Sequence, residues 1–212
     1  MTVQSVCAAP AGRVEFYRAS EKPYGVFSNL YRRPIQIEEC SFPTAEHAYQ
    51  WLKPRDARVR HWLMSAPAPS LLAIAAHVLP SDEPDADLLM GRVADRLLGF
   101  HTRPGWSRLR YPWMLRCLRT KFTLHEDLAA VLVGTGDAEL VEAGTIDDEA
   151  GRRWGVVNGR GNNYLGRMLM RVRQELGGPP ALDDDLDARL CDGKQQLATA
   201  LEAVRTIHGQ AA

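Results

Sequence analysis

The spacing of apolar and polar positions divides this chain into a strand-rich beginning and a mostly helical remainder. VEFY at 14–17 and the alternating PIQIEEC at 34–40 are typical of short strands, and KPYG at 22–25 marks a turn between them. The next segment, FPTAEHAYQWLK at 42–53, has helical composition. Thr44 is suited to cap the start of this helix, and Pro54 disfavours its continuation.

The pattern also predicts the later elements. Helical signal runs through 56–76 with a break at 66–70, followed by a surface loop at 80–87, a helix at 88–99 and a turn at 103–106. Apolar spacing from 112 to 133 predicts two helices, and AELVEA at 138–143 predicts a short strand. A Gly- and Arg-rich loop at 151–162 leads into a helix whose apolar stripe comprises Leu165, Met168, Leu169, Val172 and Leu176.

The strongest linker signal is GGPP at 177–180. We therefore expect an α+β fold: a mainly helical single domain with a few short strands at 14–176. A flexible lead-in at 1–13 precedes it, and a linker with a C-terminal helix to about residue 208 occupies 177–212. This tail has three interpretations: an appended helix, a capping element or a contact for a partner.

Composition narrows the function. The 212 residues carry 26 Lys and Arg against 26 Asp and Glu, so a long phosphate track is not the expected partner, although a local basic pocket is allowed. The four cysteines have neither C-x-x-C nor zinc spacing, which favours reduced thiols and no metal, with a disulfide left open. No signal peptide is evident, and the apolar run at 71–79 is too short to span a bilayer. We expect a cytoplasmic protein without cofactor.

The helix at 44–53 is the first candidate for chemistry. Four of its side chains share one face at i, i+3, i+4 and i+7, namely Glu46, Tyr49, Gln50 and Lys53. Glu46 and Lys53 lie about 10 Å apart along a helix axis, far enough to flank a substrate. The structural alternative is a dipole-stabilising Glu46 and a solvated Lys53. His47 is expected to pack, because no metal-ligand partner is spaced around it.

A set of fragments in fixed order resembles the NADAR family, also called YbiA-like. They are FYRASEKPYGVFSNLY at 16–31, PIQIEECSFPTAEHAYQWLK at 34–53, LRTKF at 118–122, TGDAELVEAGTIDD at 135–148, WG at 154–155 and GNNYLGRMLMRVR at 161–173. The resemblance covers roughly 14–176. It implies a compact α+β domain with N-glycosidase activity, either on riboflavin-pathway ribosylamino-pyrimidine phosphates or on ADP-ribosylated guanine in nucleic acid.

The resemblance also implies site residues. The family's central helix maps to Ala45, Glu46, His47, Gln50 and Lys53. Its acidic residue falls by counting at Asp147, with Asp148 the neighbour, and its later motifs fall at Trp154, Gly155, Gly161, Asn163, Leu165 and Gly166. Two departures stand out. Lys53 is followed by Pro54 where the family has Phe, and EAGRR is inserted before Trp154.

Three residues are predicted to carry the reaction. Glu46 is the acid/base or the group that stabilises a developing cation, and Asp147 positions water or a ribose hydroxyl. Lys53 either acts as a cation, holding phosphate or protonating the leaving group, or attacks open-chain ribose to form a Schiff base. The substrate-binding candidates, each with a structural alternative, are Ser28, Asn29, Tyr49, Gln50, Arg119, Trp154, Gly155 and Asn163. Lys121 is assigned a structural role.

The predicted function is metal-independent removal of ADP-ribose from guanine in DNA or RNA. Arg152, Arg153 and Arg160 in the inserted loop favour a ligand with a pyrophosphate. The alternatives are hydrolysis of a phosphoribosyl-amino-pyrimidine, a non-catalytic sensor of ADP-ribose or another NAD metabolite, and a scaffold whose C-terminal helix recruits a protein partner.

Overall fold

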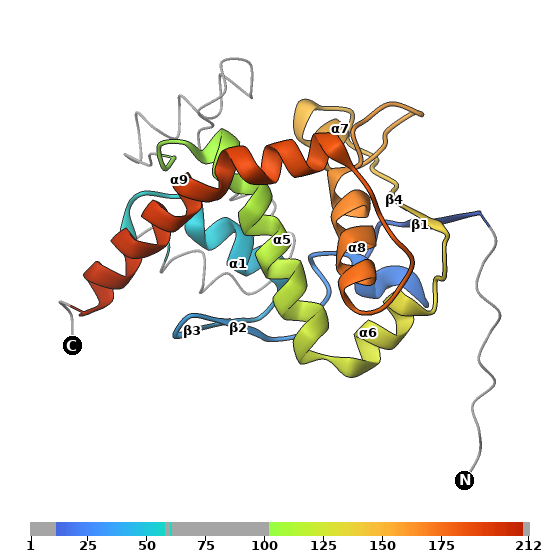
Figure 1. Ribbon diagram of the computed structural model, residues 1–212, viewed down its shortest axis with the longest axis horizontal. Helices are drawn as coiled ribbons and strands as arrows, with labels where there is room; N and C mark the ends of the chain where they lie inside the picture. The colour runs from blue at the N-terminus through green and yellow to red at the C-terminus, as the bar shows by residue number, and fades with distance from the viewer. Residues whose placement is uncertain (1–11, 58–59, 61–101, 210–212) are drawn as a thin grey trace, which may run out of the picture. The chain divides into compact units, whose positions relative to one another are not determined.

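A computed structural model describes residues 12–57, 60 and 102–209, which form two compact units (Figure 1). The first unit comprises 12–31 and 122–183, and the second comprises 32–57, 60, 102–121 and 184–209. The described part holds six α-helices and four short strands, which confirms the predicted mixed α/β class. The predictions for 1–11, for 61–101 and for residues 58–59 concern parts of the chain outside this description.

The first unit is built on a parallel strand pair. β1 (Arg13–Phe16) pairs with β4 (Glu139–Glu142), with Val14 opposite Leu140 and Phe16 opposite Glu142. β1 therefore begins at the last residue of the expected lead-in. KPYG, predicted as a turn, leads into the 3₁₀ helix η1 (Tyr24–Phe27), whose Phe27 ring packs against Phe16 and Phe122.

Three helices complete this unit: α6 (Glu126–Val133), α7 (Glu149–Trp154) and α8 (Tyr164–Glu175). α8 lies along β4, and four members of its predicted apolar stripe are buried, namely Leu165, Met168, Leu169 and Val172 (Figure 1). The prediction of a loop from 151 was wrong in its first residues, because α7 occupies them. The Asp148 side chain caps this helix, with the Gly151 N–H donating to Oδ1 at 2.6 Å.

The second unit contains a hairpin and the helix predicted at 44–53. β2 (Ile35–Ile37) and β3 (Cys40–Phe42) pair antiparallel, with Ile35 opposite Phe42. α1 (Ala45–Leu52) follows. Its N-cap is Thr44, whose hydroxyl accepts from the backbone N–H of His47 at 3.2 Å. The predicted bounds of α1 are confirmed.

α5 (Trp106–Leu124) corrects the prediction of two helices starting at Pro112. The helix begins six residues earlier and continues through this proline, while α6 supplies the second predicted helix. A proline cannot donate to the carbonyl four residues back, here that of Arg108. The buried Leu109, Trp113 and Met114 on both sides of Pro112 explain why packing overrides this local penalty.

The C-terminal tail folds into the second unit as α9 (Asp184–Gly209). α9 passes close to α5 at Gly193, where an added Cβ would lie 2.2 Å from the Arg108 carbonyl oxygen. Farther along, Arg205 donates to the Glu38 carboxylate at 2.8 Å, and Arg116 of α5 pairs with the same carboxylate. α9 thus belongs to the second unit, and the predicted domain bounds and protein partner stay predictions.

No helix of the described residues is long and apolar enough to cross a membrane. The three cysteines in these ranges, Cys40, Cys117 and Cys191, carry free thiols, whereas Cys7 lies outside them.

Asn163 fastens α8 to β4 in the first unit. It occupies the N-cap position of α8 with a left-handed φ of 52° and makes no capping bond. Its side chain instead accepts from the Glu142 N–H at 3.1 Å and donates to the Leu140 carbonyl at 2.8 Å. Both ends of the Asn163 amide are thus bonded to the strand, so this side chain joins α8 to β4 instead of capping the helix.

Replacing Asn163 with glycine is expected to destabilise the protein by about 2–3 kcal/mol, because two buried hydrogen bonds are lost while the left-handed backbone is preserved. Asn158 is an exposed residue with a similar φ of 51° and supplies the matched control. Asn158→Gly should change the stability little. Chemical denaturation measures both variants, and equal stability losses would contradict the assigned role of Asn163.

Candidate active site

The fully buried Trp113 fixes α1 on α5. Its indole N–H points at two successive carbonyl groups of α1, those of Ala48 at 3.0 Å and Tyr49 at 3.2 Å. Ala45, Ala48 and Leu52 have no exposed surface. The backbone of α1 is thereby held rigidly from its middle, and the remaining polar face carries the candidate residues.

Glu46 and Gln50 form one polar unit on that face. The Gln50 side-chain amide donates to the Glu46 carboxylate at 2.7 Å. This geometry fits an ionised carboxylate, which accepts hydrogen bonds and donates none. Glu46 is half-buried and close to the start of α1, where the helix dipole also favours its charged form.

The carbonyl end of Gln50 is buried without a hydrogen-bond partner. Gln50 is 5% exposed, and its Oε1 accepts no hydrogen bond. Burying an amide oxygen without a donor is unfavourable by about 1–3 kcal/mol. The Gln50 amide is therefore bonded to Glu46 through its nitrogen and has no donor at its oxygen.

The neighbouring side chains of α1 belong to the core. Tyr49 is buried, with its ring centroid 5.1 Å from that of Trp106. His47 Nδ1 lies 2.8 Å from the Thr44 hydroxyl, in agreement with the packing role predicted for this histidine. Burial raises the pKa of the Cys117 thiol on α5 well above its ordinary value, and the nearby Glu46 carboxylate adds to this effect.

Lys53 is the C-cap of α1 and is half-buried. It therefore lies at the opposite end of the helix from Glu46. The sequence predicted Glu46, Tyr49, Gln50 and Lys53 on one helix face. In the structure Tyr49 and Gln50 are both buried, and Glu46 and Lys53 are half-buried.

α5 carries the two remaining candidate cations of the second unit. Arg119 is exposed, whereas Lys121 has no exposed surface. Burial lowers the pKa of Lys121 to about 7. Sequence reasoning gave Lys121 a structural role without detecting its complete burial. Its burial could have been predicted from its place in the apolar repeat of α5, next to Phe122 and one turn after Cys117.

The first unit presents Asp147 on the segment after β4. Asp147 is exposed, and its carboxylate lies 3.2 Å from Arg152 Nε. Asp148 is half-buried, with its carboxylate used to cap α7. Of the two aspartates, Asp147 is therefore the one whose carboxylate is directed to the surface.

Trp154 and Gly155 end α7 next to β4. Trp154 is half-buried, and a Cβ at Gly155 would lie 2.5 Å from the Glu142 carbonyl oxygen. Gly155 is thus required by close packing of two backbones, as is Gly161, where a Cβ would lie 2.0 Å from the Gly155 carbonyl oxygen. This geometry, like that of Asn163, favours structural roles for residues that were candidates for binding.

Ser28 and Asn29 follow η1 and are buried in the first unit. The Ser28 hydroxyl accepts from the Leu30 N–H at 3.3 Å, and its backbone N–H donates to Gly25. These contacts belong to a turn. The candidates thus fall into two groups, with Glu46, Tyr49, Gln50, Lys53 and Arg119 in the second unit and Ser28, Asn29, Asp147, Trp154, Gly155 and Asn163 in the first.

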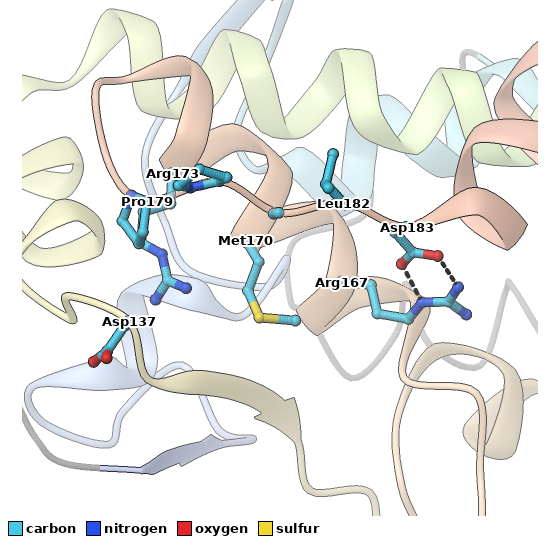
Figure 2. Close-up of a pocket in the computed structure, with 9 residues that line it drawn as sticks. Asp137, Arg167, Met170, Arg173, Pro179, Leu182 and Asp183 are labelled. Atoms are coloured by element: carbon cyan, nitrogen blue, oxygen red, sulfur yellow. Dashed lines mark hydrogen bonds and ion pairs between the residues drawn. The ribbon is translucent and has the colours of Figure 1, made fainter.

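A pocket of about 230 Å³ lies in the first unit between α8 and the segment 179–183 (Figure 2). Arg167 at its edge is paired with Asp183, and the buried Arg173 donates to the Thr135 hydroxyl and the Ala138 carbonyl. The pocket contains none of the candidate residues, so we do not assign the reaction to it. Across the described ranges, no cluster of three His, Cys, Asp or Glu side chains is arranged for a metal ion.

Comparison with known proteins identifies the family. The NADAR domain profile matches residues 15–177. The chain belongs to the NADAR family. It is 32% identical over 164 residues to the N-glycosidase YbiA of Escherichia coli, spanning 77% of this chain and 88% of that protein. The N-glycosidase Npun_R5314 of Nostoc punctiforme is 32% identical over 167 residues, spanning 77% and 92%.

Two further similarities extend this result. The NMR structure of E. coli YbiA matches with a TM-score of 0.60 and 30% identity, covering 82% of this chain and 94% of that one. The riboflavin biosynthesis protein PYRR of Zea mays is 29% identical over 174 residues, spanning 79% of this chain and 26% of that protein. The family predicted from the sequence is confirmed.

The burial of Lys121 can be tested through the pH dependence of the protein's stability. Because its folded pKa is lowered to about 7, the unfolded chain binds more protons than the folded one between about pH 7 and its ordinary pKa of 10.5. The cost of burying the charge is full below pH 7 and disappears as the pH rises through that window. The stability of Lys121→Met relative to wild type should therefore be greatest near pH 6 and decline towards pH 10.

Thermal unfolding across this pH range measures the effect. Lys194, an exposed lysine of α9, supplies the control, and Lys194→Met should show no such trend. A pH-independent difference between Lys121→Met and wild type would show that Lys121 is not buried as described.

Proposed function

We propose that this protein is an N-glycosidase that hydrolyses the bond between ribose C1 and a base nitrogen, removing ADP-ribose from guanine in DNA or RNA in the cytoplasm. The observation that carries the proposal is the Glu46 carboxylate, held by Gln50 on the first turns of α1 in a chain of the NADAR family. The curated relatives YbiA and Npun_R5314 are named N-glycosidases, which supports the reaction class.

The chemistry requires a fixed negative charge. Positive charge develops on ribose C1 as the C1–N bond breaks, and an oriented carboxylate stabilises that charge without rearranging. The amide of Gln50 favours the ionised form of Glu46, so we assign Glu46 to this role or to that of a base for the attacking water. The departing base takes up a proton, and water supplies the new oxygen on C1.

Gln50 has a second role in this proposal. Its unsatisfied Oε1 is suited to accept a hydrogen bond from the hydroxyl on ribose C2, the carbon bonded to C1. Hydrogen bonds to the corresponding hydroxyl of glycosides strengthen in the transition state of their hydrolysis. One side chain would then hold both the catalytic carboxylate and the sugar.

Asp147 and Lys53 complete the proposed set. We assign Asp147 to orienting water or a ribose hydroxyl, on the strength of the family motif and of its surface-directed carboxylate. Lys53 is assigned to a phosphate of the substrate, because it lies at the end of α1 opposite Glu46. Formation of an imine between Lys53 and C1 of the open-chain ribose is the alternative role of this lysine.

The substrate has two candidates. Removal of ADP-ribose from guanine suits the three arginines Arg152, Arg153 and Arg160, although Arg152 and Arg153 are paired with Asp147 and Glu149. Hydrolysis of a riboflavin-pathway ribosylamino-pyrimidine phosphate is the second candidate, favoured by the name of the similar PYRR protein. Both substrates carry a ribose joined through C1 to nitrogen.

The deciding experiment is mass spectrometry of products after incubation with ADP-ribosylated guanine DNA and, separately, with a ribosylamino-pyrimidine phosphate. Release of free ADP-ribose supports the first substrate, and turnover of the pyrimidine alone supports the second. Tight binding of ADP-ribose with neither substrate cleaved would replace the enzyme with a sensor of NAD metabolites.

Substitutions on α1 test the roles of its side chains. Glu46→Gln is expected to lower kcat by about a hundredfold or more, because the charge facing C1 is removed. Gln50→Leu is expected to lower kcat/KM by about tenfold, the effect of one buried hydrogen bond. Steady-state kinetics measure both variants.

The exposed Gln36 of β2 supplies the control for Gln50. Gln36→Leu should retain the kcat/KM of wild type. Full activity in Glu46→Gln would remove the basis of the proposed mechanism.

A further inference from the structure

Four basic residues lie at or next to the C-terminal end of α1. Lys53 ends the helix, Arg55 and Arg60 follow it in sequence, and Arg103 is brought to the same place from the segment before α5. The stretch containing Arg103 is attached by a backbone bond from its N–H to the Lys53 carbonyl at 2.8 Å and by a bridge between Pro54 and Thr102. These contacts make the cluster a fixed feature of the second unit.

The buried Arg60 and the half-buried Arg103 are held by carbonyl groups. Arg103 Nε donates to the Leu52 carbonyl at 3.0 Å. Arg60, which is 3% exposed, donates to the Arg55 carbonyl at 3.1 Å, and its guanidinium lies 5.7 Å from the Trp51 ring centre. A guanidinium has five N–H donors in a planar fork, so these bonds fix its position while using a minority of its donors.

Capping of α1 accounts for part of this cluster. Cations near a helix C-terminus are favoured by the helix dipole and by its last carbonyl groups. One or two positive charges satisfy that requirement. Residues 52–57, 60 and 102–106 include four cations and a single acidic residue, Asp56.

The cations are close enough to affect one another. Burial, together with the positive charges of Arg60 and Arg55, lowers the pKa of Arg103 to about 10. Such mutual repulsion costs stability in the ligand-free protein, and an anion bound among the side chains would relieve it.

We propose that Lys53, Arg55 and Arg103, supported from behind by the buried Arg60, form a site for the phosphate or pyrophosphate of the ligand. The anion site follows from the charges themselves, and the identity of the molecule that carries the phosphate rests on the proposed function. In that function Glu46 faces C1 at one end of α1, about 10 Å along the axis from Lys53 at the other.

Binding to the full-length protein tests this site. The probes are inorganic pyrophosphate, ADP-ribose and ribose 5-phosphate, with adenosine as a ligand that lacks phosphate, each measured by calorimetry. Arg55 is exposed, so Arg55→Glu reverses a charge with little effect on folding. We expect its Kd for pyrophosphate and ADP-ribose to rise about tenfold or more, since charge-assisted hydrogen bonds are strong, while adenosine binding is unchanged.

Two further variants make the test specific. Arg103→Gln should weaken pyrophosphate binding to a similar degree, with thermal unfolding measured to confirm that it is folded. Arg108, an exposed arginine of α5 paired with Asp192, supplies the matched charge reversal, and Arg108→Glu should bind pyrophosphate as wild type does. Weaker binding at higher salt is expected of wild type.

The possible outcomes separate the anion site from the proposed reaction. Wild-type affinity in both Arg55→Glu and Arg103→Gln, an equal loss in Arg108→Glu, or no binding of pyrophosphate by wild type would each overturn the site. Binding of pyrophosphate through these arginines without cleavage of any N-glycoside would sustain the site and reject the N-glycosidase. A preference for ADP-ribose over ribose 5-phosphate that is lost in Arg55→Glu would identify the bound group as a pyrophosphate.

Discussion

The indole of Trp113 is the contact on which the polar face of α1 depends. Its single N–H is directed at two adjacent carbonyl groups of α1, and the ring itself has no exposed surface. α1 is only eight residues long, too short to be stable alone, so its helical form relies on this packing. The positions of Glu46 and Gln50 are set by a tryptophan more than sixty residues away.

A different constraint organises the first unit. There the amide of Asn163 joins the first turn of α8 to two backbone groups of β4, and Gly155 lets the end of α7 approach the same strand. The family motif around these residues therefore has an architectural explanation. Motif residues are often assigned to ligand binding from sequence alone, and here the geometry shows what several of them do for the fold.

The charges at the two ends of α1 contribute to the stability of the helix and also suit the proposed function. A carboxylate near the helix start and cations near its end both complement the helix dipole, which stabilises the structure in the absence of any ligand. The same arrangement matches the charge distribution of a phosphoribosyl group in reaction, with positive charge on C1 and negative charge on phosphate. The excess of cations at one end and the unsatisfied Gln50 oxygen beside Glu46 exceed what stability alone requires.

The sequence by itself determined the local elements and the family. Periodicity found α1 with its Thr44 cap, the hairpin strand at Ile35, the strand at Leu140 and the buried stripe of α8, because these depend on neighbouring residues. It placed Glu46 and Gln50 on one face for the same reason. Its assignments of catalytic roles stay predictions, since a pattern of residues carries no distances.

Only the tertiary structure decided the rest. Packing extends α5 six residues before Pro112, where the sequence pattern predicts the start of a helix, and it buries Lys121 completely. The parallel pairing of β1 with β4 and the arrival of Arg103 at the end of α1 join segments far apart in the chain. Such contacts are governed by burial and backbone hydrogen bonding over the whole unit. Helical or strand periodicity depends on neighbouring residues and therefore does not predict them.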